Sequence, residues 1–203
     1  MNQHLYRFAY AVLRPFYALF YPARVDGLEN IPAEGAFILC CNHCNARDPF
    51  YLAVRQPRRY LHFMAKADLF KRKLVGRFIT ALGGFPVDRG HSDLSAVRTA
   101  LQLLKDGHCM AIFPQGTRVK DNHPTPMLDG VSMIALRSGA PVIPAYIGGP
   151  YRLFRRTQVS FGKPVSFDGL PSRVDSATLD LATRRIEDAV WSLRKPIWPP
   201  FLC

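Results

Sequence analysis

Short apolar runs alternate with stretches of helical periodicity along most of this chain, and this alternation constrains the fold more than any other feature. Five runs have the length and composition of buried strands, at residues 36–41, 61–65, 85–88, 109–113 and 141–147. Helical patterns occur at residues 68–82, 92–106, 131–138 and 179–193. Strands and helices in this rhythm predict an α/β fold, a single-domain sandwich with a mixed, largely parallel sheet flanked by helices.

The helix expected over residues 92–106 has the clearest pattern. Ser92 is expected to cap its start, and Gly107 is expected to end it. Its apolar face is formed by Leu94, Val97, Leu101 and Leu104.

Residues 3–21 are densely aromatic and apolar, and no acidic residue precedes Asp26. Arg7, Arg14 and Pro15 interrupt the segment, which therefore lacks the span of about 20 apolar residues that crosses a bilayer. No small-residue cleavage site follows, so we expect no secretory signal. Tyrosine, phenylalanine and arginine together suit the headgroup boundary, so residues 1–23 are expected to lie as helix in a membrane interface. The alternative is a helix packed on the protein's own core.

The composition excludes a disordered chain and predicts anionic partners. Of the 203 residues, 48% are hydrophobic and 21% are charged, with a net charge of +12. Such a charge suits a phospholipid surface, a phosphorylated substrate or cofactor, or nucleic acid. The five cysteines are odd in number and lack disulfide-framework spacing, which favours a reducing compartment.

Cys40, Cys41, His43 and Cys44 superficially resemble metal ligands. However, Cys40 and Cys41 fall on opposite faces of the expected strand, and no second cysteine pair completes a site. We therefore expect small buried thiols and no metal.

The segment Asn42-His43-Cys44-Asn45-Ala46-Arg47-Asp48-Pro49 follows the buried run 36–41. A carboxylate that fixes the tautomer of an imidazole and stabilises its protonated form makes that imidazole a better general base. The loop end of a buried strand is also where α/β sheets place their chemistry. Taken alone, Asp48 could instead be only a helix cap and His43 only a surface residue.

Three further polar turns follow or flank expected strands, at residues 83–90, 112–118 and 140–144. Their glycines allow close approach of a ligand and could offer backbone amide donors. Arg89 and Arg118 offer rigid forks for a phosphate. Taken singly, each turn is weak evidence, because Gly116-Thr117-Arg118 could be a solvated turn and Asp88-Arg89 a local ion pair.

Together, these segments resemble the glycerolipid acyltransferases, the family that includes 1-acylglycerol-3-phosphate acyltransferase. The family carries Asn-His-x4-Asp, Gly-x-x-x-Val-Asp-Arg-like, Phe-Pro-Glu-Gly-Thr-Arg and Val-Pro-Val-x-Pro-like motifs in this order. The match runs from about Val25 to Ile147 and includes Met64-Ala65-Lys66 and Leu69-Phe70. It implies a glycerol-3-phosphate acyltransferase-like sandwich, with residues 24–203 as the acyltransferase domain.

The resemblance also implies roles for individual residues. His43 would deprotonate a glycerol hydroxyl, which attacks the carbonyl of an acyl thioester, and Asp48 would orient His43. Backbone amides near the glycine-rich turn would bind the oxyanion. The implied substrate-binding residues are Lys66, Gly84, Asp88, Arg89, Gln115, Gly116, Thr117, Arg118 and Pro144; Arg89 and Arg118, with Lys66, would hold the acceptor's phosphate.

The implied activity transfers a fatty acyl chain from acyl-CoA or acyl carrier protein to 1-acylglycerol-3-phosphate, forming phosphatidic acid. Neither a metal nor a cofactor is needed, because a thioester is already activated. Two departures from the family pattern leave a different lysolipid acceptor open. Gln115 replaces the usual Glu, and Leu128-Asp129-Gly130 stands where many relatives carry Phe-Lys-x-Gly.

Basic residues gather between the first two motifs, at Arg55, Arg58, Arg59, Lys71, Arg72, Lys73 and Arg77. With the aromatic amino-terminal segment they provide two membrane signals, so we expect peripheral or monotopic attachment to the cytoplasmic face of a membrane, on anionic phospholipid. The carboxy-terminal segment Trp198–Leu202 could add a third contact. The alternative is a merely solvated basic face.

Two other functions remain open from the residues. One is thioester hydrolysis, with water or Cys44 as the nucleophile, although adjacent side chains such as His43 and Cys44 rarely face one another productively. The other is a non-catalytic module that binds lipid or nucleic acid. We expect no nucleic-acid partner, because the aromatic residues are not interleaved with the basic cluster as a stacking platform requires.

Overall fold

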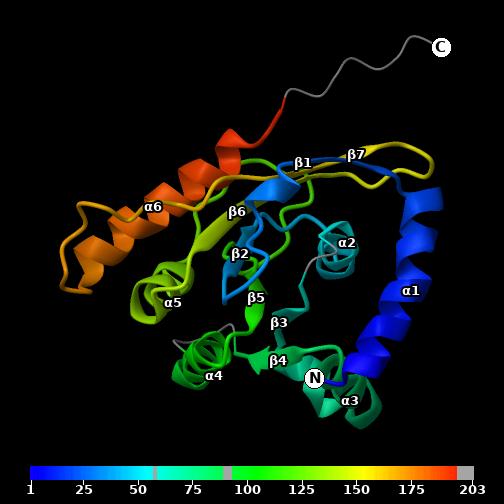
Figure 1. Cartoon of the computed structure of the whole chain (residues 1–203), viewed down its shortest axis with the longest axis horizontal. Helices are drawn as coiled ribbons and strands as arrows, with labels where there is room; N and C mark the ends of the chain where they lie inside the picture. The colour runs from blue at the N-terminus through cyan, green and yellow to red at the C-terminus, as the bar shows by residue number, and fades with distance from the viewer. Residues whose placement is uncertain (57–58, 89–92, 196–203) are drawn as a thin grey trace.

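A seven-stranded mixed sheet forms the centre of the molecule (Figure 1). The computed structural model describes residues 1–56, 59–88 and 93–195. The strands are β1 (Ala23–Asp26), β2 (Ile38–Cys41), β3 (Leu61–Lys66), β4 (Gly84–Val87), β5 (Cys109–Ile112), β6 (Val142–Gly148) and β7 (Thr157–Phe161). They lie in the order β1-β7-β6-β2-β5-β3-β4, and every neighbouring pair is parallel except β6 and β7.

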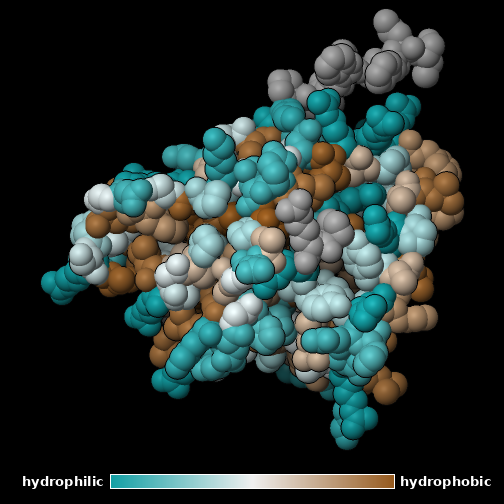
Figure 2. All heavy atoms as spheres, viewed as in Figure 1, coloured by the Kyte–Doolittle hydropathy of each residue, from teal (hydrophilic) through white to brown (hydrophobic). Residues whose placement is uncertain are grey.

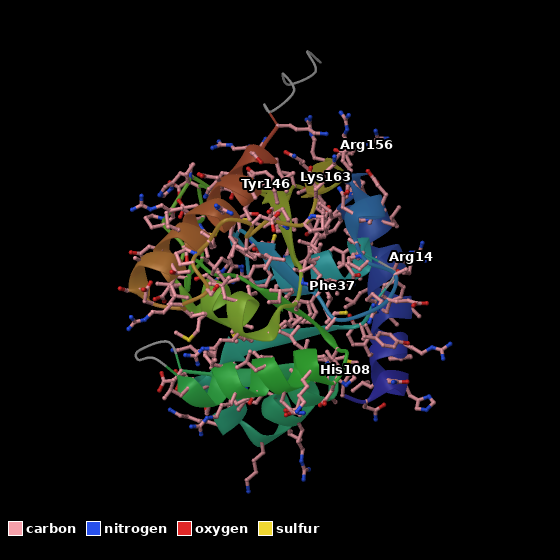
Figure 3. All side chains as sticks on the ribbon, turned by 60° about the vertical axis from the view of Figure 1, so that its left-hand side comes forward. Arg14, Phe37, His108, Tyr146, Arg156 and Lys163 are labelled. Atoms are coloured by element: carbon pink, nitrogen blue, oxygen red, sulfur yellow. The ribbon has the colours of Figure 1, made fainter. Side chains whose placement is uncertain are left out.

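Helices cover both faces of the sheet (Figure 1). They are α1 (Gln3–Phe20), α2 (Asp48–Arg55), α3 (Lys73–Ala81), α4 (Leu94–Lys105), α5 (Gly130–Ser138) and α6 (Ser176–Ser192), with short 3-10 helices at Leu28–Asn30 and Ala67–Lys71. One core cluster joins α1 and α2 to the sheet, and Phe37 lies fully buried within it (Figure 3). A second cluster packs α4, α5 and α6 against the opposite face. This architecture confirms the expected α/β sandwich with a largely parallel sheet.

The two cysteines of β2 show how the strand serves both cores. Cys40 belongs to the cluster under α4, α5 and α6, whereas Cys41 belongs to the cluster under α1 and α2. Consecutive side chains of a strand point to opposite faces, so the expected separation of the two thiols is confirmed. A strand buried on both sides must be apolar at every position, which explains the continuous run Ile38-Leu39-Cys40-Cys41.

The parallel strands β2, β3, β4, β5 and β6 all end at the same edge of the sheet. The polar turns that follow them therefore meet at this edge, although they are far apart in the sequence. The sheet thus assembles one surface from the segments singled out in the sequence.

Two strands were not expected from the sequence. β1 and β7 pair with each other and run opposite to the other five strands. Their residues, Ala-Arg-Val-Asp and Thr-Gln-Val-Ser-Phe, mix polar and apolar side chains in short runs. The helical stretch expected over 68–82 is divided into a 3-10 turn and α3, and α3 ends at Ala81.

The expected cap of α4 is wrong. Ser92 lies outside the described residues, and Asp93 caps the helix by accepting hydrogen bonds from the backbone amides of Ser95 and Ala96. Leu94 is correspondingly exposed, while Ala96, Ala100 and Leu104 are buried. Gly107 follows the helix at a φ of +80°, as expected for a residue that terminates it.

Helix α1 is apolar on two sides. Tyr6 and Tyr17 are buried against the rest of the protein, whereas Phe8, Val12, Phe16 and Leu19 are exposed. Hydrophobic side chains line the edge of the molecule that α1 occupies (Figure 2), and Arg14 also lies on this helix (Figure 3). The expected boundary between residues 23 and 24 falls inside β1. In the described ranges, no helix is long and apolar enough to cross a membrane.

Candidate active site

His43 and Asp48 form a buried pair at the edge where the parallel strands end. Their exposed fractions are 7% and 0%, and Nδ1 of His43 lies 2.8 Å from Oδ2 of Asp48. His43 follows β2, and Asp48 begins α2, with Pro49 in the first helical turn. The same oxygen, Oδ2, accepts hydrogen bonds from the backbone amides of Cys44 at 2.7 Å and Asn45 at 2.8 Å. The loop therefore folds around the carboxylate, and the reading of His43 as a surface residue is wrong.

The pair leaves one nitrogen of the imidazole available for chemistry. Since Nδ1 donates its proton to the Asp48 carboxylate, Nε2 carries the free lone pair. Nε2 makes no hydrogen bond to any residue of the described ranges. An imidazole with a fixed tautomer and an unused lone pair is the arrangement that a general base requires.

Aromatic side chains fix the plane of the imidazole. The His43 ring stacks on Phe113, which follows β5, with ring centroids 4.4 Å apart and an interplanar angle of 28°. Phe63 of β3 stacks in turn on Phe113, at 6.5 Å and 12°. The sequence reasoning missed both phenylalanines as site residues. Phe113 could have been found, because it directly precedes the Pro-Gln-Gly-Thr-Arg turn.

The turn after β5 holds His43 through its backbone. Oε1 of Gln115 accepts the His43 amide proton at 2.5 Å, and the Val119 amide donates to the His43 carbonyl at 2.8 Å. A glutamate at position 115 could accept the same bond, so the Gln115 side chain preserves this contact without a charge. Nε2 of Gln115 is buried and has no partner among the described residues.

Asn42 anchors the loop on its other side. Its side-chain amide bonds Asn122 at 2.6 Å and the Ile147 carbonyl at 2.9 Å, and its Oδ1 accepts the Ile147 amide at 2.7 Å. Asn122 also bonds Tyr146, which lies beside α6 (Figure 3). Asn122 has a φ of +53°, a conformation that Asn tolerates better than most residues. Nothing in the sequence near Asn122 signals this role.

The structure brings part of the expected phosphate site to His43. Arg118 directly precedes Val119, whose amide is bonded to His43, and its side chain is exposed. Thr117 is exposed on the same turn, and Gly116 has a φ of +68°, which favours glycine. Arg89 lies outside the described residues. Lys66 ends β3, is exposed and forms an ion pair with Asp68 at 2.6 Å.

Three other expected site residues make packing contacts or hydrogen bonds within the fold. Gly84 is buried in β4, where a Cβ would collide with Ile79 of α3, so helix packing accounts for the glycine. Asp88 is exposed after β4, and its amide donates to Asp93 at 2.8 Å. Pro144 is buried in β6 in register with Cys40, on the face covered by α4, α5 and α6.

Cys44 is not a candidate nucleophile. Its side chain is buried, and burial, followed by the nearby Asp48 charge, raises the pKa of its thiol to about 12. A thiol with such a pKa is neutral at physiological pH, whereas nucleophilic cysteines need a thiolate. In the described part of the chain, no three His, Cys, Asp or Glu side chains are placed to hold a metal ion.

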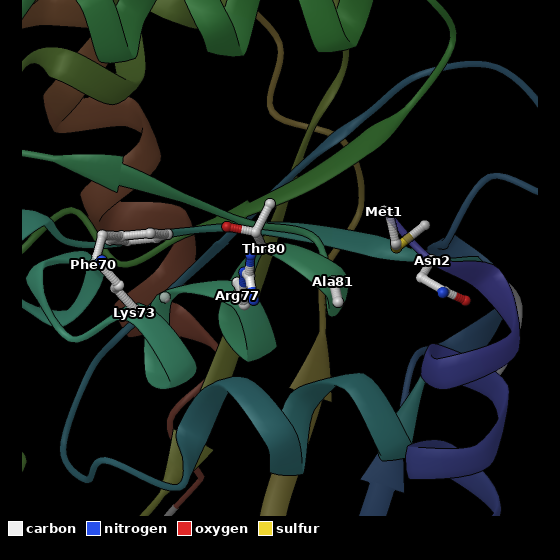
Figure 4. Close-up of a pocket in the computed structure, with 8 residues that line it drawn as sticks. Met1, Asn2, Phe70, Lys73, Arg77, Thr80 and Ala81 are labelled. Carbon is white, nitrogen blue, oxygen red and sulfur yellow. The ribbon is translucent and has the colours of Figure 1, made fainter.

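A small apolar cavity of about 60 Å³ lies between α1 and α2. Pro49, next to Asp48, and Phe63, which stacks on Phe113, line its wall together with Tyr10 and Leu13 of α1. A larger open cavity of about 830 Å³ lies between the start of α1 and α3, where Lys73 and Arg77 line it beside Phe70 (Figure 4). Only the smaller cavity shares residues with the surroundings of His43.

A family model described as Acyltransferase matches residues 22–148. This chain belongs to the acyltransferase family. The matched span contains all four motifs, so the family resemblance found in the sequence is confirmed. The chain is therefore an enzyme of the acyl-transferring class.

Individual relatives agree with the family assignment. The 1-acyl-sn-glycerol-3-phosphate acyltransferase of Bacillus subtilis (strain 168) is 33% identical over 193 residues, which cover 91% of this chain and 96% of the relative. The enzyme of the same name from Streptococcus pneumoniae is 28% identical over 169 residues, covering 80% of this chain and 62% of the relative. The crystal structure of the 1-acyl-sn-glycerophosphate acyltransferase PlsC from Thermotoga maritima has a TM-score of 0.71 and 27% identity, covering 94% of this chain and 77% of that one.

Proposed function

We propose that this enzyme transfers a fatty acyl chain from an acyl thioester to the free hydroxyl of 1-acylglycerol-3-phosphate, forming phosphatidic acid. The observation that carries the proposal is the buried His43–Asp48 pair at the edge where the strands end, in which Nε2 of His43 has no hydrogen-bond partner among the described residues. The names of the relatives support the acceptor. Acyl-CoA and acyl carrier protein are the two candidate donors, and no cofactor takes part.

His43 performs the proton transfers in this reaction. Nε2 removes the proton of the acceptor hydroxyl as its oxygen attacks the thioester carbonyl. The tetrahedral intermediate then collapses, the carbon–sulfur bond breaks, and the thiolate receives the proton from the imidazolium. Asp48 stabilises the imidazolium and keeps the ring in the required tautomer, because Nδ1 is bonded to its carboxylate.

The substrate groups have candidate positions around the pair. Arg118 directly precedes Val119, whose amide bonds the His43 carbonyl. It would hold the acceptor's phosphate together with Arg89 and Lys66. The apolar side chains of α1 and α2 that line the small cavity, Pro49 next to Asp48 among them, would contact the acyl chain. Pro144 would act only indirectly, through the packing of β6.

We further propose that the enzyme attaches to the cytoplasmic face of a membrane, as a peripheral or monotopic protein. The exposed face of α1 carries Phe8, Val12, Phe16 and Leu19. Leu74 and Phe78 of α3 are also exposed and lie among Arg72, Lys73 and Arg77. An apolar surface flanked by cations suits an anionic phospholipid interface, where both kinds of attraction add.

His43→Ala tests the reaction. We expect kcat/KM for labelled palmitoyl thioester and 1-acylglycerol-3-phosphate to fall at least about 10³-fold, because the variant lacks the base. The readout is identification of the lipid products, with a panel of acceptors that includes other lysolipids. His123→Ala is the matched control, since His123 is exposed and its Nδ1 contacts only Asp121, at 3.1 Å, among the described side chains. Full turnover in His43→Ala would contradict the proposal.

A further inference from the structure

The two carboxylate oxygens of Asp48 have different partners. Oδ2 accepts hydrogen bonds from the His43 ring and two backbone amides. Oδ1 accepts a hydrogen bond of 2.6 Å from the hydroxyl of Tyr151. The only other contact to Oδ1 within the described residues is the Cys44 thiol at 3.7 Å, a weak donor. Tyr151 therefore supplies the principal bond that holds this side of the carboxylate.

Tyr151 reaches Asp48 from a segment that lies 103 positions away in the sequence. Its ring contacts Tyr51 of α2 with centroids 4.8 Å apart and Tyr21 at 6.4 Å, both edge to face. Three residues further on, the Phe154 amide donates to the Phe20 carbonyl at the end of α1, at 2.8 Å. Packing and a backbone bond thus hold the segment where the phenol meets the carboxylate.

We propose that Tyr151 is a positioning residue for acyl transfer, acting on His43 through Asp48. This inference depends on the proposed function, because it assumes that the His43–Asp48 pair performs the chemistry. The phenol prevents the carboxylate from rotating about its Cβ–Cγ bond, so that Oδ2 stays directed at Nδ1. It also stabilises part of the negative charge that would otherwise act on the imidazole.

The ionisable neighbours of the pair keep this arrangement constant over the working pH range. Burial is the main cause that raises the pKa of Tyr151, and the Asp48 charge raises it further, so the phenol remains a donor. Burial also raises the pKa values of Cys41, Cys44 and Tyr17, which face the pair from β2, the following loop and α1. The neighbouring cation is Arg47, which directly precedes Asp48 at the start of α2. With their pKa values raised, these thiols and phenols stay neutral between pH 5 and 8.

Tyr151→Phe removes the bond and keeps the ring. Without the phenol, the Asp48 charge acts more strongly on the protonated imidazole, so the base becomes available only at higher pH. We expect kcat/KM to fall about tenfold. We also expect the acid limb of its pH profile to move up by about half a pH unit or more. The measurement is kcat/KM from pH 5 to pH 9, with thermal unfolding recorded for every variant.

Tyr51→Phe is the matched control, because Tyr51 belongs to the same aromatic cluster but its hydroxyl bonds the carbonyls of Tyr21 and Pro22, both at 3.1 Å. This variant is expected to unfold at lower temperature without moving the acid limb. An equal shift in Tyr51→Phe, or an unmoved limb in Tyr151→Phe, would overturn the positioning role. Parallel measurement of His43→Ala separates the two proposals, since its continued turnover would refute the catalytic pair and not only Tyr151.

Discussion

His43 and Cys44 are neighbours in the chain and have opposite chemical surroundings. His43 has a carboxylate partner and, in the described part of the chain, no bond to its Nε2, whereas the Cys44 thiol is buried beside the same carboxylate. A negative charge favours a protonated imidazole and disfavours a thiolate. One Asp48 side chain therefore suits the imidazole to the proposed role of base and suppresses the cysteine as a nucleophile, which removes the basis for thioester hydrolysis through Cys44.

Cys44→Ala tests this separation. We expect acyl transfer to remain within about threefold of the unmodified enzyme, with a loss of about 1 kcal/mol in unfolding free energy for the small cavity. Thiol reagents should leave the activity of the unmodified enzyme intact at neutral pH, because the pKa of the thiol is raised to about 12. Kinetics and denaturant unfolding provide the two measurements. Inactivation by a thiol reagent that substrate prevents would restore Cys44 as a nucleophile.

At the scale of elements, the basic cluster between the first two motifs divides into two groups. Arg55 donates to the carbonyls of Tyr17 and Tyr21 at the end of α1, at 2.9 and 2.8 Å. Arg59 donates to the carbonyls of Ala33 and Gly35. These two arginines bind the protein's own backbone, a structural role that the sequence did not predict. Arg58 and the segment Trp198–Leu202 lie outside the described residues, which leaves Lys71, Arg72, Lys73 and Arg77.

Arg55→Ala and Arg72→Ala separate these groups. Arg55→Ala should lower the free energy of unfolding by about 1–3 kcal/mol, because it removes two charge-assisted hydrogen bonds, to the carbonyls of Tyr17 and Tyr21 at the end of α1. Arg72→Ala should preserve stability and weaken binding to anionic vesicles about fivefold, as expected for about 1 kcal/mol per cation. Urea unfolding and co-sedimentation with vesicles, with and without phosphatidylglycerol, measure the two effects. Equal vesicle binding by Arg72→Ala and the unmodified protein would count against α3 as part of the interface.

At the scale of the whole molecule, a second histidine couples stability to pH. His62 lies buried in β3, with Nδ1 bonded to the Gly83 carbonyl at 3.1 Å and Nε2 without a partner among the described residues. Burial, and then the neighbouring His108, lower the pKa of His62. The folded protein therefore binds fewer protons at this position than the unfolded chain, so stability rises with pH across the interval between the two pKa values.

We expect the unfolding free energy to decrease as the pH falls from about 7 to 5, because the unfolded His62 becomes protonated near pH 6.5 and the folded one only below it. His62→Gln should show a shallower decrease over the same interval. Denaturant unfolding at several pH values measures both slopes. Identical slopes would mean that other groups cause the acid sensitivity.

Local patterns were sufficient to predict five strands, the helical regions and the His43–Asp48 pair. Strands buried on both faces are continuously apolar, and the motif residues are close together in the chain, so no distant contact was needed to recognise them. β1 and β7 were missed, because short runs with mixed polarity become strands only when each pairs with the other at the sheet margin. The cap at Asp93 was missed by one residue, a boundary that hydrogen-bond geometry decides.

By itself, the sequence determined the family, the layered α/β plan and the pairing of His43 with Asp48, because periodicity and motif spacing record these directly. The tertiary structure alone decided which side chains complete the site. Phe113 stacks on His43, Gln115 holds its backbone, and Tyr151 bonds Asp48 from 103 positions away. It also assigned Arg55 to the end of α1. Such contacts depend on strand order and helix packing, which bring distant segments together, and no local pattern of residues encodes them.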